Sequence, residues 1–205
     1  MKCSHCMRGD AQDINITNEY IVNILKYIGQ IYQLTITGGE PSLNVNGIKF
    51  LLKELKRRKI SVERFYIATN GSESSMSNEF TDICTKLYDY QETKQEEAML
   101  EMSNDHFHNR ELHETVFAEL SKYPFFSNRY SFPDGFSLIK EGRSKVGYEN
   151  IILPLGFYDN CRIEGDFYLN ALGYIICNDN LSYENQDKLS LCHSKDIITY
   201  LKSIH

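Results

Sequence analysis

The feature that most constrains the fold is a regular alternation of short apolar segments with segments of helical period. In chain order these are a helix from Asn18, a strand Tyr32–Thr37, a helix ending near Lys59, a strand Phe65–Ala68, a helix Asn78–Tyr88, a strand Ala98–Met102, a helix Arg110–Ser121 and a strand Phe136–Ile139. Strands that alternate with helices are typical of a parallel sheet. We therefore predict an α/β fold.

The alternation changes after about residue 150. Ile151–Phe157 is a further strand candidate, and the segments Asp166–Asn170 and Tyr174–Cys177 flank a glycine-containing turn, which predicts a hairpin. A last helix is expected at Lys195–Ser203. The chain has 205 residues, which is too few for a complete eight-fold α/β barrel of about 250 residues. We expect a main domain over 1–157 and a small extension over 158–205.

Composition narrows the class of function. With 22 basic and 28 acidic residues, the chain has a net charge of −6, so we do not expect direct nucleic-acid binding. The one basic run, within 53–59, fits the solvated end of a helix. No apolar run is long enough for a membrane span, and no signal peptide is recognised, so we expect a cytoplasmic protein. The six cysteines are then free thiols or metal ligands.

Polar and glycine residues gather where the predicted strands end. These ends read Thr37-Gly38-Gly39-Glu40, Thr69-Asn70-Gly71 and Ser103-Asn104-Asp105-His106. Open α/β sheets bind ligands beyond the carboxyl ends of their strands, and paired glycines let a ligand approach the backbone closely. We expect Glu40 to face a cleft there, so that its replacement by alanine weakens ligand binding without unfolding the protein.

Two of these motifs resemble those of the radical S-adenosylmethionine enzymes. Cys3 and Cys6 match the second and third cysteines of the C-x3-C-x2-C loop, whose thiolates hold a [4Fe-4S] cluster in that family. Gly38, Gly39 and Glu40 match the glycine-glycine-glutamate segment that receives the amino group of the cofactor. The resemblance implies a partial (β/α) barrel of about five to six parallel strands, with a small hairpin and helix at the carboxyl end.

The resemblance also implies further contacts with S-adenosylmethionine. His5, beside the last cluster cysteine, is expected to stack on the cofactor or to pack locally, with cluster ligation as the less favoured alternative. Asn70 follows the third strand of the family barrel, and Ser103 and Asp105 match positions that contact the ribose or the amino acid part. Glu141-Gly142-Arg143 is similar to the end of the fifth strand.

The match departs from the family pattern at its start. The first cluster cysteine and the first barrel strand would lie before Met1, so Cys3 and Cys6 form an incomplete cluster site. Two functions stay open. One is an enzyme that cleaves S-adenosylmethionine to a 5′-deoxyadenosyl radical, with its first cysteine supplied upstream. The other is an inactive remnant that binds or inhibits a macromolecular partner, as inhibitors encoded by mobile elements do.

Without the first strand, the Tyr32–Thr37 strand is expected to lie at a sheet edge. Exposed edges pair readily with another chain, so we predict self-association or docking of a protein partner by strand addition.

The remaining cysteines and histidines allow metal and metal-free interpretations. Cys161, Cys177 and Cys192 loosely resemble the auxiliary-cluster extension of some family members, with His193 as a further donor, but the ligand set is incomplete and a metal-free hairpin is favoured. His106, His108 and His113 follow the fourth family strand, where a polar loop and a helix are favoured over a metal site. Cys84 is predicted to lie in the core.

Overall fold

The computed structural model describes residues 3–94, 98–104, 110–130, 138–151, 156–158, 162–164 and 167–203. The chain forms two compact units, which we call unit 1 (1–28 with 133–205) and unit 2 (29–132). Each unit has its own sheet and its own apolar core. The predicted domain boundary at residue 157 marks the end of the family resemblance and was not based on packing. It stays a prediction.

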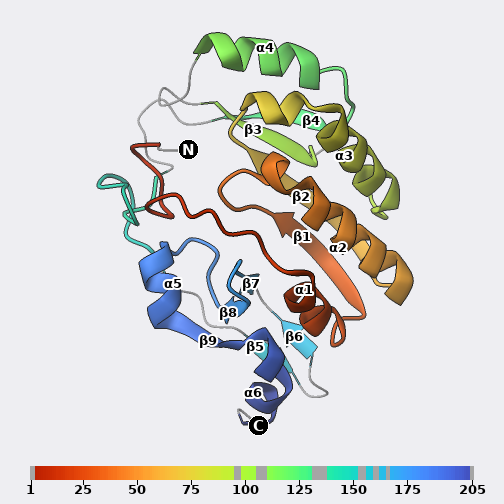
Figure 1. The fold of residues 1–205 in the computed structure, drawn as a ribbon, viewed down its shortest axis with the longest axis vertical. Helices are drawn as coiled ribbons and strands as arrows, with labels where there is room; N and C mark the ends of the chain where they lie inside the picture. Colours follow the sequence, from red (N-terminus) through yellow and green to blue (C-terminus); the bar gives the residue numbers. More distant parts are fainter. Residues whose placement is uncertain are drawn as a thin grey trace. The chain divides into compact units, whose positions relative to one another are not determined.

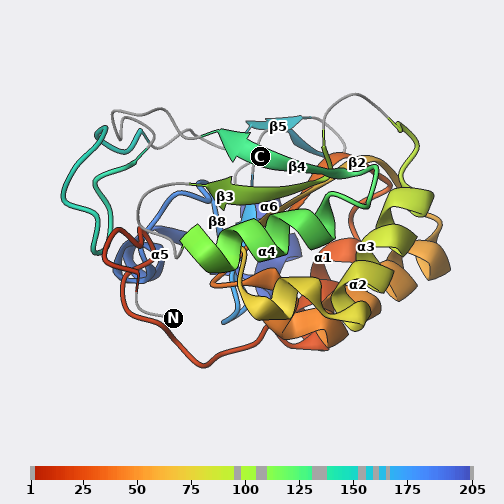
Figure 2. The same cartoon turned by 90° about the horizontal axis from the view of Figure 1, so that it is seen from above.

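Unit 2 contains a parallel sheet of four strands in the order β1-β2-β3-β4. The strands are β1 (Gln30–Ile36), β2 (Ser61–Thr69), β3 (Leu100–Asn104) and β4 (Phe126–Tyr130), and the helices between them are α2 (Val45–Arg58), α3 (Asn78–Tyr90) and α4 (Arg110–Leu120). Right-handed crossovers between successive parallel strands place all three helices on one face of the sheet, as Figure 1 and Figure 2 show. The α/β class is confirmed, whereas closure into a partial barrel stays a prediction.

Local sequence explains the ends of α2. Asn44 begins the helix by accepting a hydrogen bond from the Gly47 amide through its side chain, as N-cap residues do. The helix ends at Lys59, which has a left-handed backbone conformation with φ +57°. Arg57 and Arg58 in the last turn both contact Glu54. The basic run is therefore the end of a helix, as predicted.

Two short 3₁₀ helices connect the strand ends to the long helices. η1 (Pro41–Asn44) follows β1, and η2 (Glu73–Met76) follows β2. Fully buried side chains of β2, β3 and the helices form the core between sheet and helices, including Ile67, Phe80, Leu87, Leu100 and Val116.

Unit 1 combines an N-terminal loop and helix with the carboxyl-terminal part of the chain. Its elements are α1 (Asn18–Leu25), β5 (Gly156–Tyr158), β6 (Arg162–Glu164), β7 (Tyr168–Leu169), β8 (Tyr174–Ile176), α5 (Tyr183–Leu189), β9 (Ser190–His193), η3 (Ser194–Asp196) and α6 (Ile197–Ser203). Strands β7, β8 and β9 form an antiparallel sheet. A small core of Ile24, Ile175, Ile197 and Leu201 joins α1 to this sheet and α6.

The predicted elements differ from the observed ones in particular places. The hairpin is confirmed as β7 and β8, and the last helix as α6. The strand that follows α4 is Phe126–Tyr130, which was not predicted. Of the predicted strand Phe136–Ile139, Phe136 and Ser137 lie outside the described residues, and Ile139 forms an isolated bridge with Tyr148. Of the expected strand Ile151–Phe157, Gly156 and Phe157 belong to β5, Ile151 lies outside any strand, and 152–155 lie outside the described residues. Among the described residues, no helix has both the length and the apolar character needed to cross a membrane.

Candidate functional site

The strand ends of unit 2 are joined by the carboxylate of Glu40. Its Oε1 atom accepts hydrogen bonds from the Ser42 amide (3.1 Å), the Ser42 hydroxyl (2.7 Å) and the Thr69 hydroxyl (2.9 Å). Its Oε2 atom accepts from the Asn70 amide (2.8 Å). The side chain is buried, with 6% of the residue exposed. A single carboxylate thus connects the segment after β1 to the segment after β2.

Hydroxyl groups extend this network, and each donates its proton toward Glu40. The Ser42 hydroxyl donates to Glu40, so its contact with the Ser74 hydroxyl (2.6 Å) must use the proton of Ser74. By the same reasoning, Ser72 donates to Ser74 across 2.9 Å. The Thr69 proton also goes to Glu40, so Ser75 donates to Thr69 across 2.7 Å. Every hydroxyl proton of the network therefore points along a path toward Glu40.

Glycines border this network, and two of them face open space. A Cβ atom added at Gly38 or Gly39 would meet no atom within 4 Å. Gly38 has φ +147°, which disfavours a side chain, whereas no such value restricts Gly39. Gly71, after β2, is different: its φ is +69°, and a Cβ there would lie 2.8 Å from Nε2 of His113. The backbone is therefore accessible at the Gly38-Gly39 peptide and closely packed at Gly71.

His113 supports the second strand end from α4. Its Nε2 atom lies 2.8 Å from the Asn70 carbonyl, and the residue is buried. Since a carbonyl only accepts, the ring donates from this nitrogen. The location of His113 on a helix is confirmed, while His106 and His108 lie outside the described residues.

The predicted cofactor residues of unit 2 lie at the strand ends, with one correction. Asn70 joins the network through its backbone amide, and Ser103 is half-buried on β3. Asp105 lies outside the described residues. The expectation that Glu40 faces a cleft and can be removed without structural cost is wrong, because the carboxylate is buried and accepts four hydrogen bonds. Burial was not apparent from the sequence because two of the four donors, on Thr69 and Asn70, are distant along the chain.

In unit 1, the cysteine-containing loop is a pair of turns. The Cys6 amide donates to the Cys3 carbonyl and the Gly9 amide to the Cys6 carbonyl, each across 3.2 Å. Cys3, His5 and Cys6 are all half-buried. The Glu141-Gly142-Arg143 segment lies directly against this loop, since the Arg143 amide donates to the Cys6 carbonyl (3.0 Å). A Cβ at Gly142 would lie 2.4 Å from the Met7 carbonyl oxygen, so glycine is needed there.

Glu141 holds the adjoining loop to α5. Its carboxylate accepts from the side-chain amides of Asn150 (3.1 Å) and Asn185 (2.9 Å), and from the Ser182 backbone amide (3.1 Å). Burial alone would raise the pKa of Glu141, but these hydrogen bonds outweigh it and lower that pKa below its usual value. The sequence did not single out this role, although four asparagines at 170–185 and Asn150 were a possible signal.

Arg8 is linked to Glu141 through a peptide group. The Arg8 guanidinium donates to the Leu181 carbonyl (2.8 Å) and lies 4.9 Å from the Tyr168 ring centroid. The amide of the same Leu181–Ser182 peptide donates to Glu141. Arg8 is buried, with 6% of the residue exposed, and a buried charge needs such compensation. The peptide therefore connects a cation at one end to an anion at the other.

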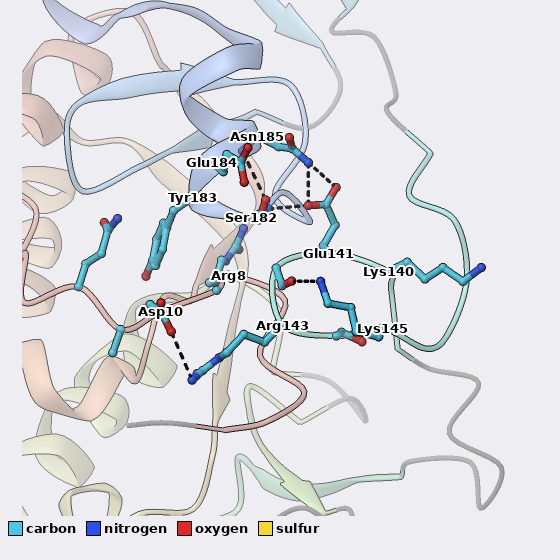
Figure 3. Close-up of a pocket in the computed structure, with 15 residues that line it drawn as sticks. Arg8, Asp10, Lys140, Glu141, Arg143, Lys145, Ser182, Tyr183, Glu184 and Asn185 are labelled. Atoms are coloured by element: carbon cyan, nitrogen blue, oxygen red, sulfur yellow. Dashed lines mark hydrogen bonds and ion pairs between the residues drawn. The ribbon is translucent and has the colours of Figure 1, made fainter.

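These segments line an open cavity of about 580 Å³ within unit 1. Its walls are residues 8–12, the 140–145 segment and the start of α5 at 182–185. Figure 3 shows Glu141 directed toward Ser182 and Asn185, and Arg143 directed toward Asp10. The volume lies in the range of pockets that hold small molecules.

The residues described do not provide the ligand set of a [4Fe-4S] cluster. The family cluster uses thiolates, and the loop offers Cys3 and Cys6. Across the described part of the chain, no three or more His, Cys, Asp or Glu side chains are grouped so that they could hold a metal ion. Cys3, His5 and Cys6 belong to unit 1, whereas the glycine-glycine-glutamate segment belongs to unit 2.

Two of the carboxyl-terminal cysteines, Cys177 and Cys192, lie in the described part of unit 1. Cys192 pairs with Ile175 in the β8–β9 ladder, and Cys177 follows β8, while Cys161 lies outside the described residues. Burial, with a smaller contribution from the Asp196 carboxylate, raises the pKa of the Cys192 thiol to about 11. His193 accepts from the Lys195 amide through Nδ1 and packs edge-on against Tyr20 and Tyr174. The interpretation as a metal-free hairpin stays a prediction.

Comparisons with models of protein families, with curated proteins and with solved structures found no match to this chain. The resemblance to the radical S-adenosylmethionine enzymes therefore stays a prediction that depends on the motifs themselves.

Proposed function

We propose that this chain is a ligand-binding protein of the radical S-adenosylmethionine type, and that it binds S-adenosylmethionine at the strand ends of unit 2. The observation that carries the proposal is the buried Glu40 carboxylate beside the open Gly38-Gly39 peptide. No described side chain forms an ion pair with this carboxylate, and hydrogen-bond donors alone stabilise it.

Charge supports this class of ligand. A buried anion that lacks a cation attracts positive charge, because the low local dielectric strengthens the interaction. S-adenosylmethionine carries a positive sulfonium and an ammonium group, whereas S-adenosylhomocysteine lacks the sulfonium charge. We therefore expect the protein to bind S-adenosylmethionine more tightly than S-adenosylhomocysteine.

Backbone access supports the position of the ligand. Gly39 is exposed, and its surroundings would accept a methyl group without a clash. A ligand that approaches this peptide closely would collide with the same methyl group. The ordered network around Glu40 keeps both strand-end loops in one arrangement, which reduces the entropy lost on binding.

The test is calorimetric titration of S-adenosylmethionine into the wild type, Gly39→Ala and Gly29→Ala. We expect Gly39→Ala to weaken binding about tenfold or more, which corresponds to about 1.4 kcal/mol, with an unchanged midpoint of thermal unfolding. Gly29→Ala is the matched control, because a Cβ at Gly29 also meets nothing within 4 Å. Its affinity should equal that of the wild type.

Two outcomes would reject the proposal. One is a wild-type protein that shows no binding of S-adenosylmethionine at millimolar concentration. The other is a Gly39→Ala variant with wild-type affinity, which would mean that no ligand approaches this peptide.

A second candidate function, docking of another chain, is favoured by the position of β1. Among the described strands, β1 pairs with β2 alone and lies at the edge of the parallel sheet. Its sequence QIYQLTI contains no charged residue, and Tyr32 is 72% exposed. Charged residues are a usual protection of edge strands against pairing. We propose that a second copy of the chain pairs with β1 in the antiparallel direction, because pairing two β1 strands brings no like-charged side chains of these strands together.

Sedimentation velocity over a range of concentrations tests this pairing. In an antiparallel pair centred on Gln33, the two Tyr32 side chains lie near the two-fold axis. Tyr32→Glu would bring two carboxylates together there, while Arg64, whose guanidinium lies 5.4 Å from the Tyr32 ring centroid, can pair with the new carboxylate within one chain. We expect the wild type to dimerise and Tyr32→Glu to stay monomeric. Leu43→Glu, at another exposed position (67%), is the control and should dimerise. A monomeric wild type would contradict the pairing.

A further inference from the structure

The cavity of unit 1 has a wall that is fixed before any ligand arrives. Glu141 holds one side of the wall to α5 through three donor residues, and Gly142 is packed against the backbone of residues 6–9. Between these contacts and the Cys6 carbonyl, the backbone of Arg143 has little freedom to move. Side chains on such a wall are presented to the cavity in a defined arrangement, which favours binding.

Arg143 lacks an acceptor that matches its guanidinium group. Its Nε atom is buried and has no hydrogen-bond partner among the described residues. Its Nη1 atom lies 3.6 Å from the carboxylate of Asp10, beyond normal hydrogen-bond length, and the Asp10 side chain is 96% exposed. A buried donor without an acceptor is unfavourable. The guanidinium is therefore held in place while most of its donor capacity is unused.

The neighbouring charges leave the cavity with an excess of positive charge near Arg143. Lys145 donates to the Gly142 carbonyl (3.0 Å) and forms no ion pair with a described residue. The acidic groups of the wall are engaged elsewhere: Glu141 by its amide donors and Glu184 by Lys188 (2.6 Å). Lys140 is paired with Glu149 (2.6 Å). Within the described part of the chain, Asp10 is the one carboxylate that competes for Arg143.

We infer that this cavity binds a small molecule through an oxyanion group, a carboxylate or a phosphate, held by Arg143 and Lys145. The planar guanidinium offers its terminal nitrogens to the oxygens of one group, and Lys145 adds a point charge. In the absence of ligand, Asp10 occupies this position loosely, and the incoming anion displaces it. The inference concerns unit 1 and is independent of the Glu40 site of unit 2.

The first test is NMR titration of the full chain with inorganic phosphate and, separately, with acetate, with chloride at matched ionic strength as the reference. We expect saturable shifts of backbone amides in residues 8–12 and 140–145 with at least one of the two probes. The probe that saturates at the lower concentration identifies the type of oxyanion. Shifts no larger than those produced by chloride would overturn the inference.

Variants of Arg143 and Asp10 give effects of opposite sign. Arg143→Lys keeps the charge but removes the planar pair of terminal nitrogens, so we expect about tenfold weaker binding. Asp10→Asn removes the competing carboxylate, so we expect binding about two- to fivefold tighter. If Arg143 had only a structural role, Asp10→Asn would not tighten binding of the probe. Arg110→Lys, at an exposed ion pair with Glu114, is the matched control and should leave the affinity unchanged.

Backbone chemical shifts in the absence of probe show whether Arg143→Lys is folded. If that variant is unfolded, Lys145→Gln and Asp10→Asn replace it, because their side-chain contacts, a carbonyl at 3.0 Å and a loose ion pair, are not part of the Glu141 contacts. The inference is overturned if Asp10→Asn weakens binding or leaves it unchanged.

Discussion

The two units each contain one buried glutamate next to a glycine, and the two carboxylates are satisfied by different kinds of donor. Glu40 accepts from two backbone amides and two hydroxyls in unit 2. Glu141 accepts from two side-chain amides and one backbone amide in unit 1. Both join segments that are distant along the chain, so each determines how loops meet in its own unit.

The kind of donor determines how well each site tolerates a neutral side chain. A backbone amide has a fixed direction and cannot become an acceptor, whereas an asparagine side chain can rotate and present its oxygen. Both carboxylate oxygens of Glu40 face a backbone amide. Only Oε2 of Glu141 does so. The Glu40 site is therefore the more rigid of the two, and the following experiments test this difference.

The largest effect is expected for Glu40→Gln. Whichever way the new amide is turned, its NH₂ group faces the backbone N–H of Ser42 or Asn70, so one buried donor loses its acceptor. We expect a loss of about 3–5 kcal/mol in the free energy of unfolding, from that donor and from weaker bonds to the remaining ones. Urea denaturation followed by circular dichroism measures it. A loss below about 1 kcal/mol would show that the strand-end loops rearrange freely.

A smaller effect is expected for Glu141→Gln. The new side chain can direct its oxygen to the Ser182 amide and its NH₂ group to Asn150 or Asn185, which can rotate to accept. We expect a loss of about 1–2 kcal/mol by the same measurement. Equal losses for the two variants would contradict the comparison, since they would mean that the kind of donor has no effect.

The pH dependence of stability is expected to differ between the wild type and Glu141→Gln. Its pKa is lowered on folding from the usual 4.5, so the stabilisation is complete above that value and is lost as the pH falls through the lower pKa of the folded state. Glu141→Gln cannot titrate at this position. We therefore expect the gap in stability between wild type and variant to narrow below pH 4.5. A gap that stays constant down to the acid transition would contradict this role.

Elements that depend on local periodicity were predictable from the sequence. The apolar positions of α2 and α3 recur at helical spacing, and the glycine turn identified the β7–β8 hairpin. Strand β4 was missed because its sequence, FSNRY, contains a polar stretch typical of a loop. It is a strand because β3 supplies a parallel partner from Leu100 to Asn104. Pairing of this kind is not visible in a single segment.

The candidate sites were predictable in composition but not in geometry. The sequence identified Gly38, Gly39 and Glu40 as a strand-end motif, yet the burial of Glu40 depends on Thr69 and Asn70, about thirty positions away in the chain. The role of Glu141 depends on Ser182 and Asn185, which are more distant still. Contacts between distant segments follow from the tertiary fold.

The hydroxyl groups near Glu40 have a further consequence. Each hydroxyl carries one proton, and each proton is already committed in the direction of the carboxylate, from Ser72 through Ser74 and Ser42. Alternative orientations of these dipoles would leave a lone pair facing a lone pair. The network therefore has very few proton arrangements of low energy. Its outermost member is Ser72, whose hydroxyl proton is used toward Ser74, so its oxygen can only accept hydrogen bonds from the surroundings. A visiting molecule would meet a surface that selects for groups with protons to give.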